Sequence, residues 1–208
     1  MTITVSELAE PDIRDAAAVL SQGFKDKMAC LKLDQNMAAD MLADTWEESP
    51  AHRYLVVKED DRIVGVVHLK IKGPKVKKVP LSVLSKKYGR GNARRYRRGM
   101  NALKEKVPNG DCYIAMLAVD EKYRGRGIAT ELLKAALDLA KTEGFHRLTL
   151  YVSKDNPAVG IYKKFGFKIV WETNNVSERI IFGIPHWYFM TILLKHDDRK
   201  EFFLHERF

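Results

Sequence analysis

Cysteine is scarce in this sequence: only Cys30 and Cys112 occur among 208 residues. Two thiols form no disulfide framework, and they show no spacing typical of a metal site. We therefore expect reduced thiols, a cytoplasmic protein and no bound metal.

The sequence also has no long apolar run. Residues 1–15 lack the basic start and apolar stretch of a secretory signal. The longest nearly apolar stretch, residues 187–194, is far shorter than the ~20 residues that cross a bilayer. With 46% hydrophobic residues, the chain has enough apolar side chains for one core. We expect a soluble protein, with a single domain over residues 1–208 and no membrane partner.

Acidic residues are nearly missing from one long segment. Residues 70–106 contain fourteen Lys or Arg and a single acid, Glu105, although the whole chain has a formal net charge of only +9. A polyanionic partner such as RNA, an acidic peptide or a phosphorylated metabolite would therefore bind here, with Tyr88 and Tyr96 stacking on bases in the case of RNA. The alternative is a basic helix exposed to solvent without a partner.

Alternating patterns and turn residues predict mixed strands and helices. A basic, helical insertion is expected at about 73–108, broken at Gly89 and Gly91, and Asp60 and Asp61 indicate a hairpin turn. The expected strands are 2–5, 52–59, 62–71, 112–119, 147–152, 167–172 and 187–195, and the expected helices are 12–24, 34–48, one or two within 81–106, 127–143 and a short one starting at Asn156.

The junction RGRGIA, residues 124–129, lies between the buried strand and a long amphipathic helix. The first turn of a helix offers unpaired N–H groups and the positive end of the helix dipole, which together bind anions. Gly125 and Gly127 leave those amides uncovered, and Arg124 and Arg126 add positive charge. This arrangement favours a diphosphate site, and a plain surface turn is the alternative.

Two common nucleotide motifs are excluded at this junction. No G-x-x-x-x-G-K-[ST] sequence occurs, so the site is not a P-loop. The dinucleotide fingerprint G-x-G-x-x-G fails at its third position, which is Thr130.

Residues 117–167, about a quarter of the chain, resemble the GNAT superfamily of acyl-CoA-dependent N-acyltransferases. The family's first pattern is Arg or Gln, Gly three positions later and a small residue two positions further on, as in Arg124, Gly127 and Ala129. Its second pattern is met by Asn156, Ala158, Tyr162, Gly166 and Phe167. The resemblance implies an α/β fold with a mixed, mostly antiparallel sheet, helices on both sides and splayed central strands.

The resemblance also implies the cofactor and the site. Acetyl-CoA would be the co-substrate, with its diphosphate on the N–H groups of Arg124, Gly125, Arg126, Gly127, Ile128 and Ala129. Its pantetheine arm would extend along Leu117, Ala118 and Val119 and contact Asn156. Tyr162 would protonate the departing thiolate. Without the resemblance, Asn156 is explained as a helix cap and Tyr162 as a core aromatic.

Many family members carry a carboxylate on the strand before the junction, where this chain has Ala115 and Met116. No general base can be assigned, because His52, His68 and His186 are better explained as surface or strand histidines. We expect direct acetyl transfer to a primary amine, on a small molecule or a peptide. The alternatives are a non-catalytic acyl-CoA-binding module and an acetyltransferase that reaches a nucleic-acid- or protein-associated amine through residues 70–106. The sequence indicates neither the acceptor nor the oligomeric state.

Overall fold

The computed structural model describes residues 3–46, 51–74, 78–103, 107–174 and 176–194. Several sequence predictions reach beyond these ranges. They are the start of the first strand at Thr2, the end of the second helix at Ser49 and Pro50, the basic residues at 75–77 and 104–106, and the last residues of the predicted domain.

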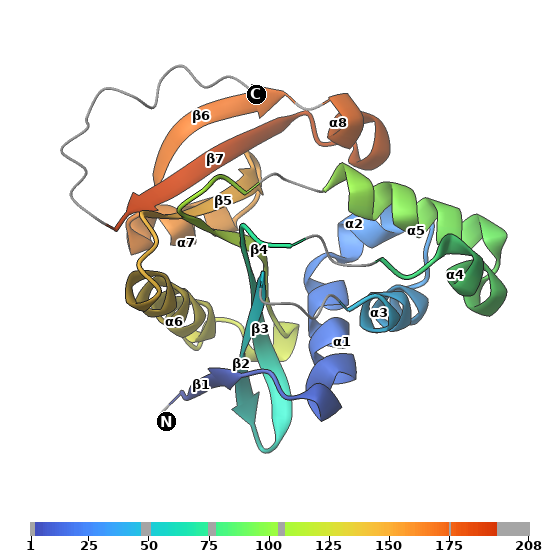
Figure 1. Cartoon of the computed structure of the whole chain (residues 1–208), viewed down its shortest axis with the longest axis horizontal. Helices are drawn as coiled ribbons and strands as arrows, with labels where there is room; N and C mark the ends of the chain where they lie inside the picture. Colours follow the sequence, from blue (N-terminus) through green and yellow to red (C-terminus); the bar gives the residue numbers. More distant parts are fainter. Residues whose placement is uncertain (1–2, 47–50, 75–77, 104–106, 175, 195–208) are drawn as a thin grey trace.

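One seven-stranded sheet organises the chain, in the order β1-β2-β3-β4-β5-β7-β6 (Figure 1). Only β4 and β5 run parallel, and every other neighbouring pair is antiparallel. The strands are β1 Val5–Glu7, β2 His52–Glu59, β3 Arg62–Ile71, β4 Asp111–Val119, β5 Arg147–Ser153, β6 Lys168–Asn174 and β7 His186–Leu193. The predicted mixed, mostly antiparallel sheet is confirmed.

Helices cover both faces of the sheet. Figure 1 shows α6 and α7 on one side and α1 and α3 on the other. The helices are α1 Ile13–Gly23, α2 Lys25–Cys30, α3 Gln35–Asp44, α4 Leu81–Tyr88, α5 Arg90–Ala102, α6 Ile128–Thr142, α7 Ala158–Phe165 and α8 Val176–Phe182, with short 3-10 turns at Glu10–Asp12 and Glu121–Tyr123. The apolar stripe of α6, including Leu132 and Leu133, packs into the main core with Val64 and Leu150.

The β2–β3 hairpin has the turn that its sequence predicts. Asp60 and Asp61 both adopt positive φ angles, 47° and 59°. Two successive residues in this region form a turn whose twist matches that of paired strands. The hairpin brings Val56 opposite Val66 and places β3 beside β4.

The two central strands separate halfway along their length. β4 pairs with β5 only from Asp111, opposite Arg147, to Ile114, opposite Leu150. The paired end is fixed by an ion pair in which Arg147 Nε lies 2.7 Å from Oδ1 of the buried Asp111. On the other side of β4 the register with β3 shifts at Ala115, which bulges and bends the strand. The separation of β4 from β5 leaves the backbone of residues 115–119 without a partner strand on that side.

Some predicted boundaries were wrong. The first strand is Val5–Glu7 rather than 2–5, because its register with β2 begins at Val5 opposite Val57. The second helix ends at Asp44, where the Thr45 hydroxyl donates to the carbonyl of Met41 and turns the chain.

Two short helices were missed, and one predicted break does not occur. α2 and α8 are too short for a helical period to stand out in the sequence. The break in the basic segment falls at Gly89, with φ 82°, whereas Gly91 lies inside α5.

Gly65 on β3 lets α6 approach the sheet closely, and this gives a stability prediction. A Cβ at residue 65 would lie 2.6 Å from Ile128 Cγ2 and 3.1 Å from Leu132 Cδ1. Gly65→Ala is expected to lower the free energy of unfolding by about 1–3 kcal/mol, as overpacking does. The control is Gly160→Ala in α7, where nothing lies within 4 Å of the new Cβ. Urea titration of both variants is the measurement, and equal midpoints would contradict the predicted close packing.

Candidate functional site

The loop of residues 124–129 follows the 3-10 turn after β4 and includes the first two residues of α6, and two glycines set its shape. Gly125 has φ 79° and Gly127, the N-cap of α6, has φ 85°. L-residues rarely adopt these angles, so the need for glycine is conformational. A Cβ on either residue would meet nothing within 4 Å, so open space lies above this backbone. The loop therefore has the room that an anion needs.

Three successive backbone amides of this loop are available to a ligand. Within the described residues, the N–H groups of Gly125, Arg126 and Gly127 donate no hydrogen bond. They lie at the N-terminus of a fifteen-residue helix, where the helix dipole favours a negative group. The backbone thus fits the diphosphate of a nucleotide, which accepts several N–H bonds at once.

The two arginines of the loop point to different partners. Arg124 Nε donates to the carbonyl of Val119 at 3.2 Å, which ties the loop to the end of β4. The Arg126 guanidinium lies 3.3 Å from both carboxylate oxygens of Glu59 and stacks over the ring of Tyr123. Arg124 lines the large cavity described next, and Arg126 is not among the described residues that line it.

A cavity of about 890 Å³ begins at this loop and continues through the gap between β4 and β5. Its size is within the range of pockets that hold cofactors. One wall is β4 from Ile114 to Val119, and the opposite wall is β5 from Leu150 to Ser153 together with the start of α7. Beyond the gap it reaches α2, α8 and the segment between α8 and β7. The predicted residues Leu117, Ala118, Val119, Gly125, Ile128, Ala129, Asn156 and Tyr162 all line it.

Tyr162 enters this cavity from α7. Its side chain is buried, with 9% exposure, and its ring makes an edge contact with Phe167. Burial raises the pKa of Tyr162 to about 12, because a phenolate is poorly solvated there. At neutral pH the hydroxyl is therefore protonated and can donate.

Asn156 precedes α7 and has a structural role of its own. Its Oδ1 accepts the N–H of Ala158 at 2.8 Å, which caps the helix. The residue is exposed and lies in the wall of the cavity, so capping leaves its side-chain NH₂ group for a ligand.

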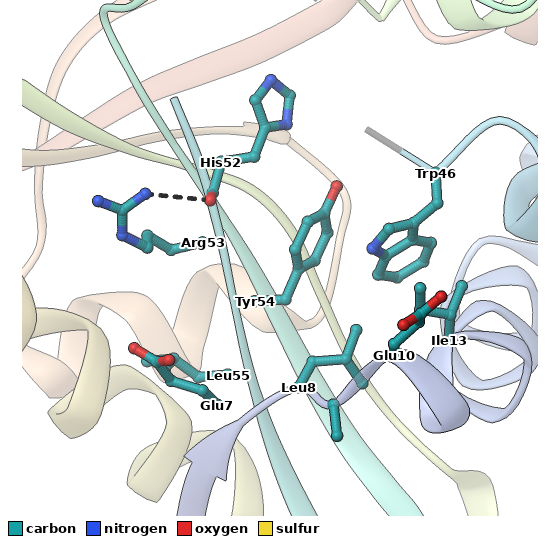
Figure 2. Close-up of a pocket in the computed structure, with 10 residues that line it drawn as sticks. Glu7, Leu8, Glu10, Ile13, Trp46, His52, Arg53, Tyr54 and Leu55 are labelled. Atoms are coloured by element: carbon teal, nitrogen blue, oxygen red, sulfur yellow. Dashed lines mark hydrogen bonds between the residues drawn. The ribbon is translucent and has the colours of Figure 1, made fainter. Parts of the chain in front are cut away.

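Two of the histidines considered as bases lie elsewhere. His52 Nδ1 and His68 Nε2 are 2.9 Å apart and share a hydrogen bond. Figure 2 shows His52 beside Tyr54 and Trp46 at a separate pocket of about 190 Å³, which shares no lining residue with the large cavity. Burial, together with the nearby charges of Lys70 and His52, holds the pKa of His68 well below its usual range.

His186 does line the large cavity, but its Nδ1 is 3.0 Å from Glu172. On β4, Ala115 and Met116 contribute no ionisable group. That no general base can be assigned to these residues stays a prediction.

The far end of the cavity holds charged residues that the sequence did not reveal. Lys27 on α2 and Glu178 on α8 both line it, and Glu178 is only 4% exposed. Lys27 Nζ lies 4.9 Å from the ring centre of Phe24 and 4.5 Å from that of Trp187. Burial lowers the pKa of Lys27 to about 8, and the charge of Glu178 opposes this shift. No sequence signal could have paired them, because each lies in a short helix that carries other charged residues as well.

The two tyrosines of the basic segment differ in their burial. Tyr96 is buried in α5, and its hydroxyl is 2.8 Å from that of Thr45. Tyr88 donates to Asp44 at 2.6 Å and packs against the helical core. The prediction that Tyr96 stacks on bases was wrong, because its ring is buried. Tyr88 is half-buried, and stacking by its ring stays a prediction.

The family model described as "Acetyltransferase (GNAT) family" matches residues 24–167 of the chain. The chain belongs to the GNAT acetyltransferase family. The match includes the 124–129 loop, the gap between β4 and β5 and Tyr162. It also extends well beyond the quarter of the chain that carries the sequence patterns.

Individual relatives agree with this assignment. N-alpha-acetyltransferase 30 of Schizosaccharomyces pombe is 46% identical over 56 residues, which is 26% of this chain and 37% of that protein. The matched region thus spans only about a third of this relative's length.

Solved GNAT structures match nearly the whole chain. The ribosomal-protein-S18-alanine N-acetyltransferase of Escherichia coli has a TM-score of 0.60 at 14% identity, over 97% of this chain and all of that one. PaiA N-acetyltransferase of Thermoplasma acidophilum, solved with coenzyme A, has a TM-score of 0.56 at 15% identity, over 93% and 99%. At these identities the likeness establishes the fold.

Membrane spans and metal clusters are both absent from the part of the chain that the structure describes. None of the helices there is long and apolar enough to cross a membrane. Nor do the described residues contain a cluster of three or more His, Cys, Asp or Glu side chains arranged around a common metal position.

Gly127 gives a prediction that separates backbone strain from ligand binding. Gly127→Ala places a methyl group above the amides and strains a positive φ, so we expect coenzyme A affinity to fall about tenfold or more. Gly89→Ala is the matched control, because Gly89 has φ 82° and nothing would lie within 4 Å of an added Cβ, yet it lies far along the chain in the α4–α5 turn. Calorimetric titration with coenzyme A is the measurement. An equal loss of affinity in both variants would contradict a specific role for the loop.

Proposed function

We propose that the protein is an N-acetyltransferase that transfers the acetyl group of acetyl-CoA to a primary amine within one ternary complex, without a metal. The observation that carries this proposal is one continuous cavity. It joins unused amides at a helix N-terminus, a strand edge without a partner and a buried, protonated phenol. Membership of the GNAT family supports the same reaction.

The cofactor would enter with its diphosphate on the N–H groups of residues 124–129. Its pantetheine arm would extend along Leu117–Val119 and use the strand edge that β5 leaves open. The carbonyl of Val119 already accepts from Arg124, so we assign the N–H groups of β4, rather than this carbonyl, to the ligand. Asn156 would contact the pantetheine amides through its NH₂ group while its oxygen caps α7.

The reaction follows from where these groups lie. The neutral amine attacks the thioester carbonyl, the C–N bond forms and the C–S bond breaks. N–H groups of the bent part of β4 stabilise the oxyanion. Tyr162 donates its proton to the departing thiolate and later recovers one from the amine nitrogen through solvent. The hydroxyl is protonated at neutral pH, so it has a proton to give when a thiolate forms beside it.

A binding module that keeps the acyl-CoA pocket without turnover is the rival, and the missing carboxylate on β4 is its support. Tyr162→Phe tests the choice. We expect kcat to fall about 10²-fold in a screen of primary amines that follows free thiol from acetyl-CoA. Calorimetric affinity for acetyl-CoA should stay within about twofold of the original protein, because the lost hydroxyl acts on the leaving group and not on cofactor binding.

Tyr151→Phe is the matched control, because it removes a phenolic hydroxyl from the β5 wall of the same cavity. Its kcat should change little. Acetyl-CoA binding with no thiol release from any amine would favour the binding module.

A second function rests on the exposed side of α5. Arg90, Arg94 and Arg98 are four residues apart, so they follow one face of the helix, and all three are exposed. Within the described residues none has an acidic partner, and α4 and α5 contain no acid. Like charges at this spacing destabilise a helix, and an RNA backbone would remove that repulsion. We propose that this arginine face holds RNA that accompanies the amine substrate.

The salt dependence of RNA binding tests this proposal. The affinity for a labelled single-stranded RNA 20-mer is measured by fluorescence anisotropy at several salt concentrations. Replacing Arg90, Arg94 and Arg98 by Gln should reduce the slope of log K against log salt by about 2, at about 0.7 per contact. The control replaces three exposed lysines elsewhere, Lys163, Lys164 and Lys168. An equal change in both triple variants, or RNA binding that is insensitive to salt, would reject the face.

A further inference from the structure

The cavity contains an ammonium group of the protein itself. Lys27 Nζ lies near the ring faces of Phe24 and Trp187, at 4.9 Å and 4.5 Å from their centres. Ring faces carry partial negative charge and attract cations at these distances. The Trp187 ring is held in place, because its Nε1 donates to the carbonyl of Ile184 at 3.2 Å. The two rings therefore form a fixed place for a cation in the wall of the cavity.

A buried carboxylate completes this place. Three acids line the cavity among the described residues: Asp26, Asp155 and Glu178. Asp26 and Asp155 are exposed, whereas Glu178 is 4% exposed and interacts electrostatically with Lys27. The α2 and α8 helices that carry the pair are in direct contact, as the Cys30 thiol meets the carbonyl of Phe182 at 3.7 Å. We call Phe24, Trp187 and Glu178 the ammonium site.

Stability does not account for this arrangement. Burying a carboxylate is costly, and well-packed apolar residues of similar volume are often as stable or more stable in its place. Both charges also face a cavity rather than a filled core. Phe24, Trp187 and Glu178 thus resemble a binding site for a cation, and Lys27 of the same chain occupies it.

We propose that the ammonium site is where the acceptor amine binds, and that Lys27 occupies it in the free protein and is displaced. The acceptor is then an unhindered primary alkylamine, of the kind carried by a lysine side chain or an aliphatic diamine, which enters as the ammonium and loses a proton to solvent before its nitrogen attacks the thioester. This inference rests on the proposed acetyl transfer and gives it a substrate class. Glu178 and the two ring faces repel an acceptor whose amine is next to a carboxylate or phosphate.

Lys27 is suited to displacement. The ammonium of Lys27 lies over both rings and repels a second cation there, so the entry of that cation forces either the departure of Lys27 or the loss of its proton. Burial has already lowered the pKa of Lys27 to about 8, which reduces the cost of losing that proton. Its flexible four-carbon stem also lets the head group move without the backbone of α2.

The test uses two probes of equal chain length and opposite charge, n-butylammonium chloride and sodium butyrate. Each is titrated into ¹⁵N-labelled protein saturated with coenzyme A, at constant ionic strength, while the indole N–H signals are followed. The chain has three tryptophans, so Trp46 and Trp171 report any non-specific effect in the same spectra. We expect butylammonium to shift the Trp187 signal alone and butyrate to leave it unchanged.

Variants identify the charges involved. Lys27→Met keeps most of the stem volume and removes the internal competitor, so butylammonium should bind about tenfold more tightly. Glu178→Gln should weaken binding about tenfold, since it removes the counter-charge. Asp155→Asn, which neutralises an exposed acid in the wall of the same cavity, is the control and should stay within about twofold. With acetyl-CoA supplied, KM for butylamine should follow the same order.

The proposal is overturned if butyrate shifts Trp187 and butylammonium does not, or if Lys27→Met fails to strengthen butylammonium binding. It is also overturned if butylamine binds at Trp187 but is not acetylated. Should Glu178→Gln fail to fold, the two probes and Lys27→Met still decide the matter. Failure of the proposed function has a different signature, which is the absence of coenzyme A binding; the probes are then titrated into the free protein.

Discussion

The parting of β4 from β5 after Ile114 is the constraint on which the rest of the site depends. The ion pair between Asp111 and Arg147 closes one end of the strand pair, and the bulge at Ala115 bends β4 away from β5 at the other. A strand edge inside a protein ordinarily requires a hydrogen-bonding partner. Here the edge faces a cavity, so it remains available to an extended ligand that brings its own amides.

The N-terminus of α6 and the gap between β4 and β5 can bind the same ligand because they are close together in the chain. Only Asp120 and the 3-10 turn Glu121–Tyr123 separate β4 from the 124–129 loop, so the open strand edge and the helix N-terminus follow each other closely in the chain. The glycines at 125 and 127 permit the tight entry, and Gly65 lets α6 lie close against β3. A ligand with a diphosphate at one end and an amide-bearing arm at the other matches this order of features. Tyr162 and the proposed ammonium site line the same cavity, Tyr162 from α7 and the ammonium site from α8, β7 and the residue before α2.

Much of this arrangement could be predicted from the sequence, because the signals are local. Each of these signals lies within a few consecutive residues. They are a buried apolar strand, a glycine-rich helix start, a fifteen-residue amphipathic helix and the Asp60–Asp61 turn. The acceptor end could not be predicted in this way. Lys27 and Glu178 are about 150 positions apart, each on a helix of six or seven residues, and only the packing of α2 on α8 brings them together. Similarly, the sequence does not show that the hydroxyls of Tyr96 and Tyr88 contact Thr45 and Asp44 at the end of α3.

Hydrogen exchange of the backbone amides, measured with and without saturating coenzyme A, tests the role of the open β4 edge most directly. We predict that added coenzyme A slows exchange in two places: the free edge of β4, at residues 117–119, and the loop at residues 125–129. The amides of α4 and α5 should exchange as before. Coenzyme A that fails to bind, or that binds and protects neither the β4 edge nor the loop, would contradict the proposed site.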